Sequence, residues 1–150
     1  MRLLCDEMLR GLGRWLRAAG HDTEIAGGQD DRALLALAAA EERTLLTRDR
    51  HLARTAPPGA RLVLLGNEDL DSHTRALRAR LGLDWRFAPF TRCLVDNAPL
   101  RPAAADETAR VPGNVCAADG PIRACPRCGR VYWPGSHVRR MEARLAAWAA

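Results

Sequence analysis

Acidic residues placed after short apolar runs are the part of this sequence that could do chemistry on a phosphodiester. Asp6 follows Leu3-Leu4-Cys5, and Asp49 follows a second run of this kind. Asp30 and Asp31 stand at the start of a helical pattern, where an aspartate can act as an N-cap. Mg²⁺ and Mn²⁺ prefer carboxylate ligands, and two such ions about 4 Å apart can activate water and neutralise phosphate charge. The pattern alone leaves a shared metal site and separate structural roles open.

A second set of candidate ligands is a pair of thiols near the C-terminus. Cys125-Pro126-Arg127-Cys128 has the spacing with which two thiolates in a turn hold one tetrahedral zinc ion. The chain has 5 cysteines, an odd number that favours intracellular thiols and metal ligands over a disulfide framework. Cys5 lies inside an apolar run, so we expect it to be a buried core residue.

The hydrophobic pattern predicts the scaffold that must position the acidic residues. The expected strands are 3–5, 23–26, 44–47 and 62–65. The expected helices are 8–19, one that ends near residue 42 and one that ends at Gly82. Strands that alternate with helices form a parallel sheet covered on both faces, and ligands bind beyond the C-terminal ends of such strands. Asp6 and Asp49 occupy such ends in the predicted α/β fold.

The pattern changes after about residue 88. Prolines punctuate the rest of the chain and the apolar periodicity stops, so residues 101–121 are expected to be a loop or insertion with little order. An amphipathic helix closes the chain, and its apolar face comprises Val138, Met141, Leu145 and Trp148. We therefore expect a core of residues 1–88 and a smaller segment of residues 89–150, whose last helix packs on the core.

The charge of the chain favours a polyanionic partner. The net charge is +5, and all 23 lysine and arginine residues are arginine. Arginine holds phosphate with a two-pronged guanidinium, so we expect RNA as the partner. Arg14, Arg48 and Arg50 are candidate RNA contacts because they lie beside the acidic residues. A solvated basic surface is the alternative for any one of them.

Two absences bear on the compartment. No stretch of about 18 apolar residues occurs, so we expect no membrane span. The N-terminus has no cleavage site of a signal peptide, so we expect a cytoplasmic location. The oligomeric state and the RNA that is cut are left open.

A series of short blocks runs in a specific order along nearly the whole chain. They are Leu4-Cys5-Asp6-Glu7-Met8-Leu9, Arg14-Trp15-Leu16-Arg17, Gly20-His21-Asp22-Thr23, Asp31 to Ala38, Leu45-Leu46-Thr47-Arg48-Asp49-Arg50, Arg92-Cys93, Val111-Pro112, Cys125-Pro126-Arg127-Cys128-Gly129 and Tyr132-Trp133-Pro134-Gly135-Ser136-His137. In order and spacing these blocks resemble the Mut-seven C-terminal (Mut7-C) RNase family. The set of blocks is far more specific than any one acidic residue.

The resemblance implies a PIN-like nuclease domain joined near its C-terminus to a zinc ribbon. By position, it implies that Asp6, Asp31 and Asp49 are catalytic residues and ligands of Mg²⁺ or Mn²⁺. It favours Asp31 over Asp30. The candidates for a fourth acidic residue, which PIN nucleases commonly have, are Glu68, Asp69 and Asp71.

The resemblance also implies that Cys93 and position 96 complete a zinc site with Cys125 and Cys128. Position 96 is Asp96 in this sequence, which departs from the cysteine of the family. Aspartate can ligate zinc, although structural zinc sites mostly use cysteine and histidine. The alternatives for the fourth ligand are Cys116 and His137. A further alternative is a ribbon that has lost its metal and is held together by packing.

The predicted function is that of a metal-dependent endoribonuclease, a hydrolase that cuts RNA phosphodiester bonds. A noncatalytic RNA-binding module on a nuclease-like scaffold is the alternative, because Asp96 indicates that one metal site has drifted. A phosphatase-like α/β hydrolase ranks last. Such enzymes usually carry a second acid two residues after a nucleophilic aspartate, and here that position is Met8.

Overall fold

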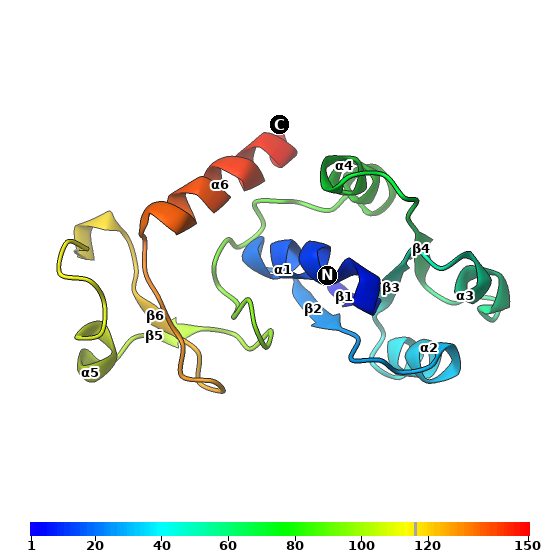
Figure 1. Ribbon diagram of the computed structural model, residues 1–150, viewed down its shortest axis with the longest axis horizontal. Helices are drawn as coiled ribbons and strands as arrows, with labels where there is room; N and C mark the ends of the chain where they lie inside the picture. Colours follow the sequence, from blue (N-terminus) through cyan, green and yellow to red (C-terminus); the bar gives the residue numbers. More distant parts are fainter. Residues whose placement is uncertain (116) are drawn as a thin grey trace.

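Four short parallel strands form the first sheet of the molecule, seen in a computed structural model that describes residues 1–115 and 117–150 (Figure 1). The strands are β1 (Arg2–Cys5), β2 (Asp22–Ile25), β3 (Thr44–Thr47) and β4 (Leu62–Leu64), in the order β2-β1-β3-β4. Leu4 of β1 pairs with Glu24 of β2 and with Leu45 of β3. Since all three pairings are parallel, the C-terminal ends of the four strands lie along one edge.

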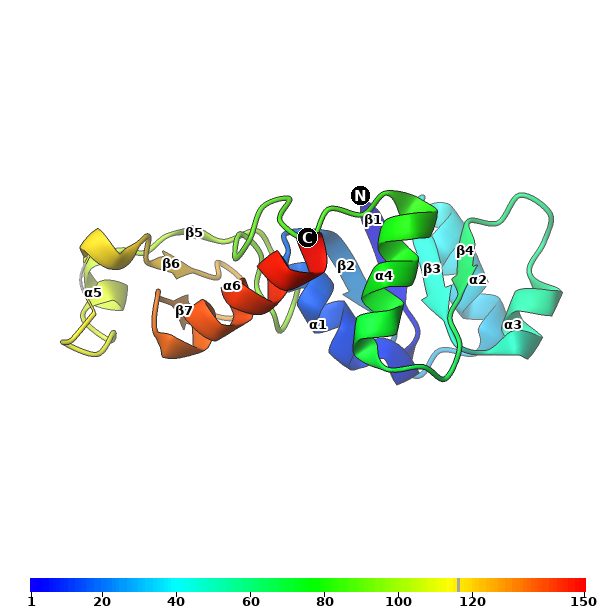
Figure 2. The ribbon, with the colours of Figure 1, turned by 90° about the horizontal axis from the view of Figure 1, so that it is seen from above.

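Helices cover both faces of this sheet (Figures 1 and 2). They are η1 (Glu7–Leu9), α1 (Arg10–Ala18), α2 (Asp31–Ala40), α3 (Arg50–Thr55) and α4 (Leu70–Leu81). The helices α1 and α4 pack on the face that carries Leu3 and Cys5, whereas α2 and α3 pack on the face that carries Leu4. Because both faces are buried, adjacent leucines occupy the middle of both central strands, Leu3-Leu4 in β1 and Leu45-Leu46 in β3. The predicted α/β fold with a parallel sheet flanked by helices is confirmed.

The sequence pattern did not predict α3. This helix has only six residues, and Leu52 is the one among them that is fully buried. One apolar contact gives no periodicity to detect. The helix forms because Asp49 caps its N-terminus and Leu52 packs into the core.

A second, smaller sheet lies in the C-terminal part of the chain. Its antiparallel strands are β5 (Arg101–Pro102), β6 (Arg123–Ala124) and β7 (Val131–Tyr132), and the short helices α5 (Ala105–Thr108) and η2 (Ala117–Asp119) follow β5. The expectation that residues 101–121 have little order is therefore wrong for residues 101–108, which form β5 and α5. Glu107 accepts hydrogen bonds from the Arg101 guanidinium (2.6 Å) and from the Ala104 N–H (2.9 Å). These polar contacts order the segment without an apolar pattern.

The closing helix α6 (Ser136–Ala149) packs on the core, as its amphipathic pattern predicted (Figure 1). Leu145 is buried in the main hydrophobic cluster. The Trp148 ring lies edge-on to Trp15 of α1 and Trp85, with centroid distances of 4.8 and 5.2 Å. The Trp148 N–H also donates to the Asp71 carboxylate of α4 (2.8 Å). Within the described residues, no helix has both the length and the apolar character that a membrane crossing requires.

Asn97 joins the C-terminal part to the edge strand β2. Its side-chain carbonyl accepts from the Thr23 N–H (2.9 Å), a backbone group on the open side of an edge strand. Its amide nitrogen donates to the Asp22 carboxylate (2.7 Å). Asn97 has a φ of +70°, a left-handed conformation that asparagine tolerates better than most residues. The side chain thus closes the free edge of the sheet.

Arg17 of α1 makes a second connection to the same region. Its side chain is 4% exposed and donates to the carbonyl of Thr23 (2.8 Å). It also donates to the carbonyls of Leu94 (3.1 Å) and Val95 (2.9 Å). A buried guanidinium needs such partners, so the segment that follows Cys93 is fixed to α1 and β2.

Asp22 and Glu41 are carboxylates that pair with the buried Arg43 beside this connection. The Arg43 side chain is 5% exposed and donates to Asp22 Oδ1 (2.8 Å). Partial burial opposes ionisation of Asp22, but the hydrogen bonds from Arg43 and Asn97 outweigh it and lower the pKa of Asp22. A carboxyl group with a depressed pKa in the folded state stabilises the fold above its ordinary pKa.

We expect Asp22→Asn to lower the free energy of unfolding by about 1–3 kcal/mol at pH 7, because Arg43 would keep a buried charge with one carboxylate fewer. As the pH falls through the folded pKa of Asp22, below the ordinary 3.8, the wild-type protein should lose the same contribution. Urea unfolding at several pH values measures the difference. Asp106→Asn, at an exposed carboxylate on α5, is the control. A difference that stays constant from pH 7 to below pH 3.8 would contradict the assignment.

Candidate functional site

The three aspartates lie at the edge of the first sheet where its parallel strands end, the lower edge in Figure 2. Asp6 is the first residue after β1, and Asp49 is the second residue after β3. Asp31 is the first residue of α2, which follows the loop after β2. The topology therefore brings residues from three separate segments to one edge.

The hydroxyl of Thr47 connects two of these aspartates. It donates to Asp6 Oδ2 (2.7 Å) and accepts from the Asp49 N–H (3.0 Å). Thr47 is the last residue of β3 and is fully buried. The backbone of Asp6 is also held, since its N–H donates to the Leu46 carbonyl (2.9 Å). Thr47 thus fixes the Asp6 carboxylate relative to the start of α3.

Asp6 and Asp49 each keep one carboxylate oxygen without a hydrogen bond to the described residues. Asp49 Oδ1 caps α3 by accepting from the N–H groups of His51 (2.8 Å) and Leu52 (3.2 Å), which leaves Oδ2. Asp6 uses Oδ2 for Thr47, which leaves Oδ1. These two oxygens are hard donors of the kind that Mg²⁺ and Mn²⁺ prefer.

The N-cap of α2 is Asp30. Its Oδ1 accepts from the Ala33 N–H (2.8 Å). The half-buried Asp31 therefore does not cap the helix, and its carboxylate makes no hydrogen bond or ion pair in the described part of the chain. Two adjacent aspartates thus have different roles, and Asp31 is the one whose side chain is free to bind a ligand.

The three carboxylates share an edge but do not form a tight cluster. In residues 1–115 and 117–150, the only group of three or more candidate ligand atoms within 4.8 Å of one another is made of cysteines and Asp96. Asp6, Asp31 and Asp49 are therefore more widely spaced than the ligands of a single closed site.

Two of the candidates for a fourth acidic ligand have structural roles. Asp69 caps α4 through the Ser72 N–H (2.8 Å), and Asp71 accepts from Trp148. Glu68 is 60% exposed, and its Oε2 lies 3.8 Å from His73 Nε2. Glu7 offers another carboxylate, since its Oε2 lies 4.0 Å from the position of a Cβ at Gly28 in the loop before α2.

The three arginines predicted to contact RNA differ in their exposure to solvent. Arg14 of α1 and Arg50 of α3 are exposed. Arg48 is half-buried, and one of its terminal nitrogens donates to Asn67 Oδ1 (2.6 Å). Its Nε is enclosed and has no partner among the described residues. Arg48 is therefore the most firmly placed of the three cations.

The cysteine cluster has the dimensions of a tetrahedral zinc site. Ligand atoms of Cys93, Asp96, Cys125 and Cys128 all lie within 4.8 Å of one another. Bonds of about 2.3 Å to sulfur and 2.1 Å to oxygen give tetrahedral edges of about 3.8 Å between sulfurs and 3.6 Å between sulfur and oxygen. The observed distances are 3.7 Å between the sulfurs of Cys93 and Cys128 and 3.4 Å from Cys125 Sγ to Asp96 Oδ1. This Cys₃Asp cluster could hold a metal ion.

The surroundings of the cluster shift the pKa values of two of its thiols in opposite directions. Burial raises the pKa of Cys125 to about 11, although the N–H groups of Cys128 and Arg127 point at its sulfur (both 3.4 Å). Burial also acts to raise the pKa of Cys128. Hydrogen bonds with Arg130 and with the thiols of Cys125 and Cys93 outweigh burial, so the pKa of Cys128 is lowered. The Tyr132 hydroxyl lies 3.0 Å from the Cys93 sulfur and orders the first turn of the cluster.

The alternatives for the fourth ligand have different outcomes. His137 lies in the first turn of α6 and is not part of the cluster, so that alternative was wrong. Cys116 lies outside the described residues. Asp96 itself is within the cluster, and hydrogen bonds from the Ala98 N–H and the neighbouring thiols outweigh its burial and lower its pKa.

Comparison with known protein families matches residues 1–145 to the Mut7-C RNAse domain. The chain belongs to the Mut7-C RNAse domain family. Comparisons with curated proteins and with solved structures gave no match. Membership of an RNase family indicates a nuclease-like function that involves RNA. The family to which the sequence blocks were assigned is thereby confirmed.

We expect Thr47→Val to lower the free energy of unfolding by about 1–3 kcal/mol, because an oxygen of the half-buried Asp6 and the Asp49 N–H would both lose their partner. Thr47→Ser keeps the hydroxyl and should cost only about 1 kcal/mol for the lost methyl group. Urea unfolding of the two variants measures the difference. Equal stability of Thr47→Val and Thr47→Ser would mean that the hydroxyl does not hold the two aspartates.

Proposed function

We propose that this chain is a metal-dependent endoribonuclease of PIN-like architecture, in which Asp6, Asp31 and Asp49 bind Mg²⁺ or Mn²⁺. The observation that carries the proposal is the Thr47 hydroxyl, which joins Asp6 to Asp49 at the C-terminal edge of a parallel sheet. Ligand sites of open α/β sheets occur at this edge. The family indicates RNA as the substrate.

The residues at the edge suit a pair of ions better than a single one. A divalent ion would supply an activated water molecule and neutralise charge on the phosphate. Asp6 and Asp49 would hold the principal ion with the oxygens that they keep free. Asp31, on α2, would complete that site or hold a second ion about 4 Å away.

The positive residues would hold the phosphates on either side of the cut. Arg48 and Arg50 flank Asp49 in the sequence, and Arg14 is exposed on α1. Contacts of this kind position RNA without reading its sequence. We assign residues 1–88 to the nuclease core and residues 89–150 to the ribbon-like segment with its closing helix.

We expect Asp31→Asn and Asp49→Asn each to reduce Mn²⁺-dependent cleavage of RNA by at least about 100-fold with the fold retained, because each removes a negative metal ligand. Asparagine caps helices as well as aspartate does, so Asp49→Asn should keep the start of α3. Asp30→Asn is the matched control, since it changes the adjacent cap of α2 and should remain active. Full activity of Asp31→Asn would remove the proposed mechanism, and RNA binding without any cleavage would favour the noncatalytic module.

For the cysteine cluster we propose a structural zinc ion held by Cys93, Asp96, Cys125 and Cys128. The support is the match between the observed distances and the edges of a zinc tetrahedron. Zinc would link the turn at Cys93 to the turn at Cys125, which are otherwise joined by two-residue strands and few apolar contacts. Asp96 makes this a weaker ligand set than four cysteines.

We expect the purified protein to contain about one zinc ion per chain and Cys125→Ser to contain almost none, because three ligands hold zinc poorly in a structural site. Elemental analysis measures the content, and Cys5→Ala is the control, since Cys5 is buried in the first sheet away from the cluster. Asp96→Cys should retain zinc against a chelator better than the wild-type protein. A wild-type protein that is free of zinc yet fully folded would show that packing alone holds the ribbon.

A further inference from the structure

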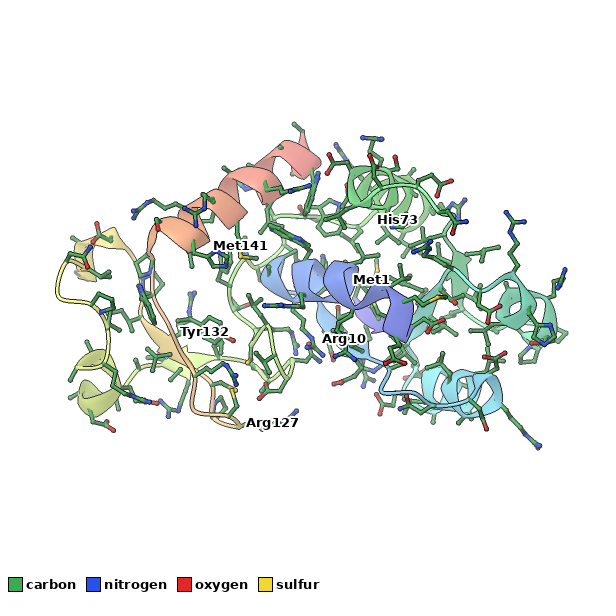
Figure 3. The ribbon with its side chains drawn as sticks, in the orientation of Figure 1. Met1, Arg10, His73, Arg127, Tyr132 and Met141 are labelled. Atoms are coloured by element: carbon green, nitrogen blue, oxygen red, sulfur yellow. The ribbon has the colours of Figure 1, made fainter. Side chains whose placement is uncertain are left out.

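A hollow of 260 Å³ opens beside the acidic edge, between the start of α1 and the start of α4. The residues that line the hollow include Met8, Leu9, Leu12, Trp15, Arg48 and His73. Met8 follows Asp6 by two residues, and Arg48 directly precedes Asp49. The hollow therefore adjoins the two candidate ligands on the face of the sheet that α1 and α4 cover, opposite Asp31 and α2. Figure 3 shows His73 at the side of α4 that faces α1.

The lining of the hollow suits a flat ring system. Leu9 and Leu12 are buried, whereas Met8 is a large apolar side chain that is 59% exposed. Methionine is flexible and polarizable, so it adapts to a bound ring. Sites for drug-sized ligands are roughly 300–1,000 Å³, so this hollow is suited to one base rather than a larger ligand.

Arg48 places a positive charge in the lining of the hollow, and no ion pair with the described residues accounts for that charge. One terminal nitrogen is fixed by Asn67 (2.6 Å), but Nε is enclosed without a partner. An enclosed donor without a partner costs about 1–3 kcal/mol, which favours a role for Arg48 beyond the fold. The adjacent residue is Asp49, so a phosphate held by Arg48 would lie next to the acidic edge.

We infer that this hollow is a base-binding subsite, which takes the base of one unpaired nucleotide while Arg48 holds the phosphate that joins it to the bond to be cut. The position of this base next to the bond to be cut rests on the proposed nuclease function. Binding of the base in the hollow does not depend on cleavage. A base must leave its stack to enter, so paired RNA is excluded from the subsite.

Gly11 provides a variant that fills the hollow with little risk to the fold. Gly11 lines the hollow within α1, and a Cβ added there meets no atom within 4 Å. Leucine is also a better helix former than glycine, by up to about 1 kcal/mol. Gly113→Leu is the matched control, because an added Cβ at Gly113 also meets nothing within 4 Å and Gly113 lies in the C-terminal part.

The test measures the affinity for a fluorescent single-stranded oligoribonucleotide by anisotropy, without added Mg²⁺ or Mn²⁺ so that no cleavage is needed. We expect Gly11→Leu to weaken binding about 5- to 100-fold, because the leucine would keep the base from stacking on Trp15 in the lining, and stacking of a base on an aromatic ring contributes about 1–3 kcal/mol. Met8→Ala and Arg48→Gln should each weaken it, and Gly113→Leu should not. A blunt duplex of the same sequence should bind more weakly than the single strand and be insensitive to Gly11→Leu.

A scan of abasic positions along the oligoribonucleotide separates a base pocket from general attraction. One abasic position should weaken binding to the wild-type protein but have no further effect on Gly11→Leu. Unchanged affinity of Gly11→Leu, or equal losses at every abasic position, would overturn the subsite. If binding behaves as expected but no Mn²⁺-dependent cleavage occurs, the subsite stands and the nuclease proposal fails.

Discussion

The hydroxyl of Thr47 is the contact on which the candidate site depends. Parallel strands bring Asp6 and Asp49 to one edge, but two carboxylates without a cation repel each other and would separate. A single buried hydroxyl donates to one aspartate and accepts from the backbone of the other, so it sets their separation without adding charge. The cap of α3 then occupies one Asp49 oxygen and leaves the second free. Local hydrogen bonds thus prepare an anionic edge before any ion arrives.

The two sheets are held together by polar contacts as well as by apolar packing. Asn97 pairs with the backbone of the edge strand β2, and Arg17 reaches the carbonyls that follow Cys93. The same turn supplies Cys93 and Asp96 to the cysteine cluster. An ion in that cluster would therefore stabilise the turn that covers the sheet edge, so the C-terminal segment acts as a support for the core.

Features that depend on apolar patterns and on the spacing of residues could be predicted from the sequence. It identified the four core strands, the closing helix and the residues of the cysteine cluster, because these follow from periodicity, family blocks and ligand spacing. It did not predict α3 or the order of residues 101–108, since one buried leucine and the Arg101–Glu107 pair leave no periodic signal. The family resemblance favoured Asp31 over Asp30 as a metal ligand, but the residue pattern did not show which of the two caps α2, because either residue can cap a helix. Only the backbone geometry at the start of α2 separates them.

Titration of the protein with Mn²⁺, followed by the electron paramagnetic resonance of the free ion, tests without any RNA whether Asp6, Asp31 and Asp49 bind divalent cations together. We expect the wild-type protein to bind Mn²⁺ and Asp6→Asn to lose this binding, whereas Asp30→Asn should keep it. Equal Mn²⁺ binding by the wild-type protein and Asp6→Asn, or none by the wild-type protein, would show that these aspartates do not form a cation site.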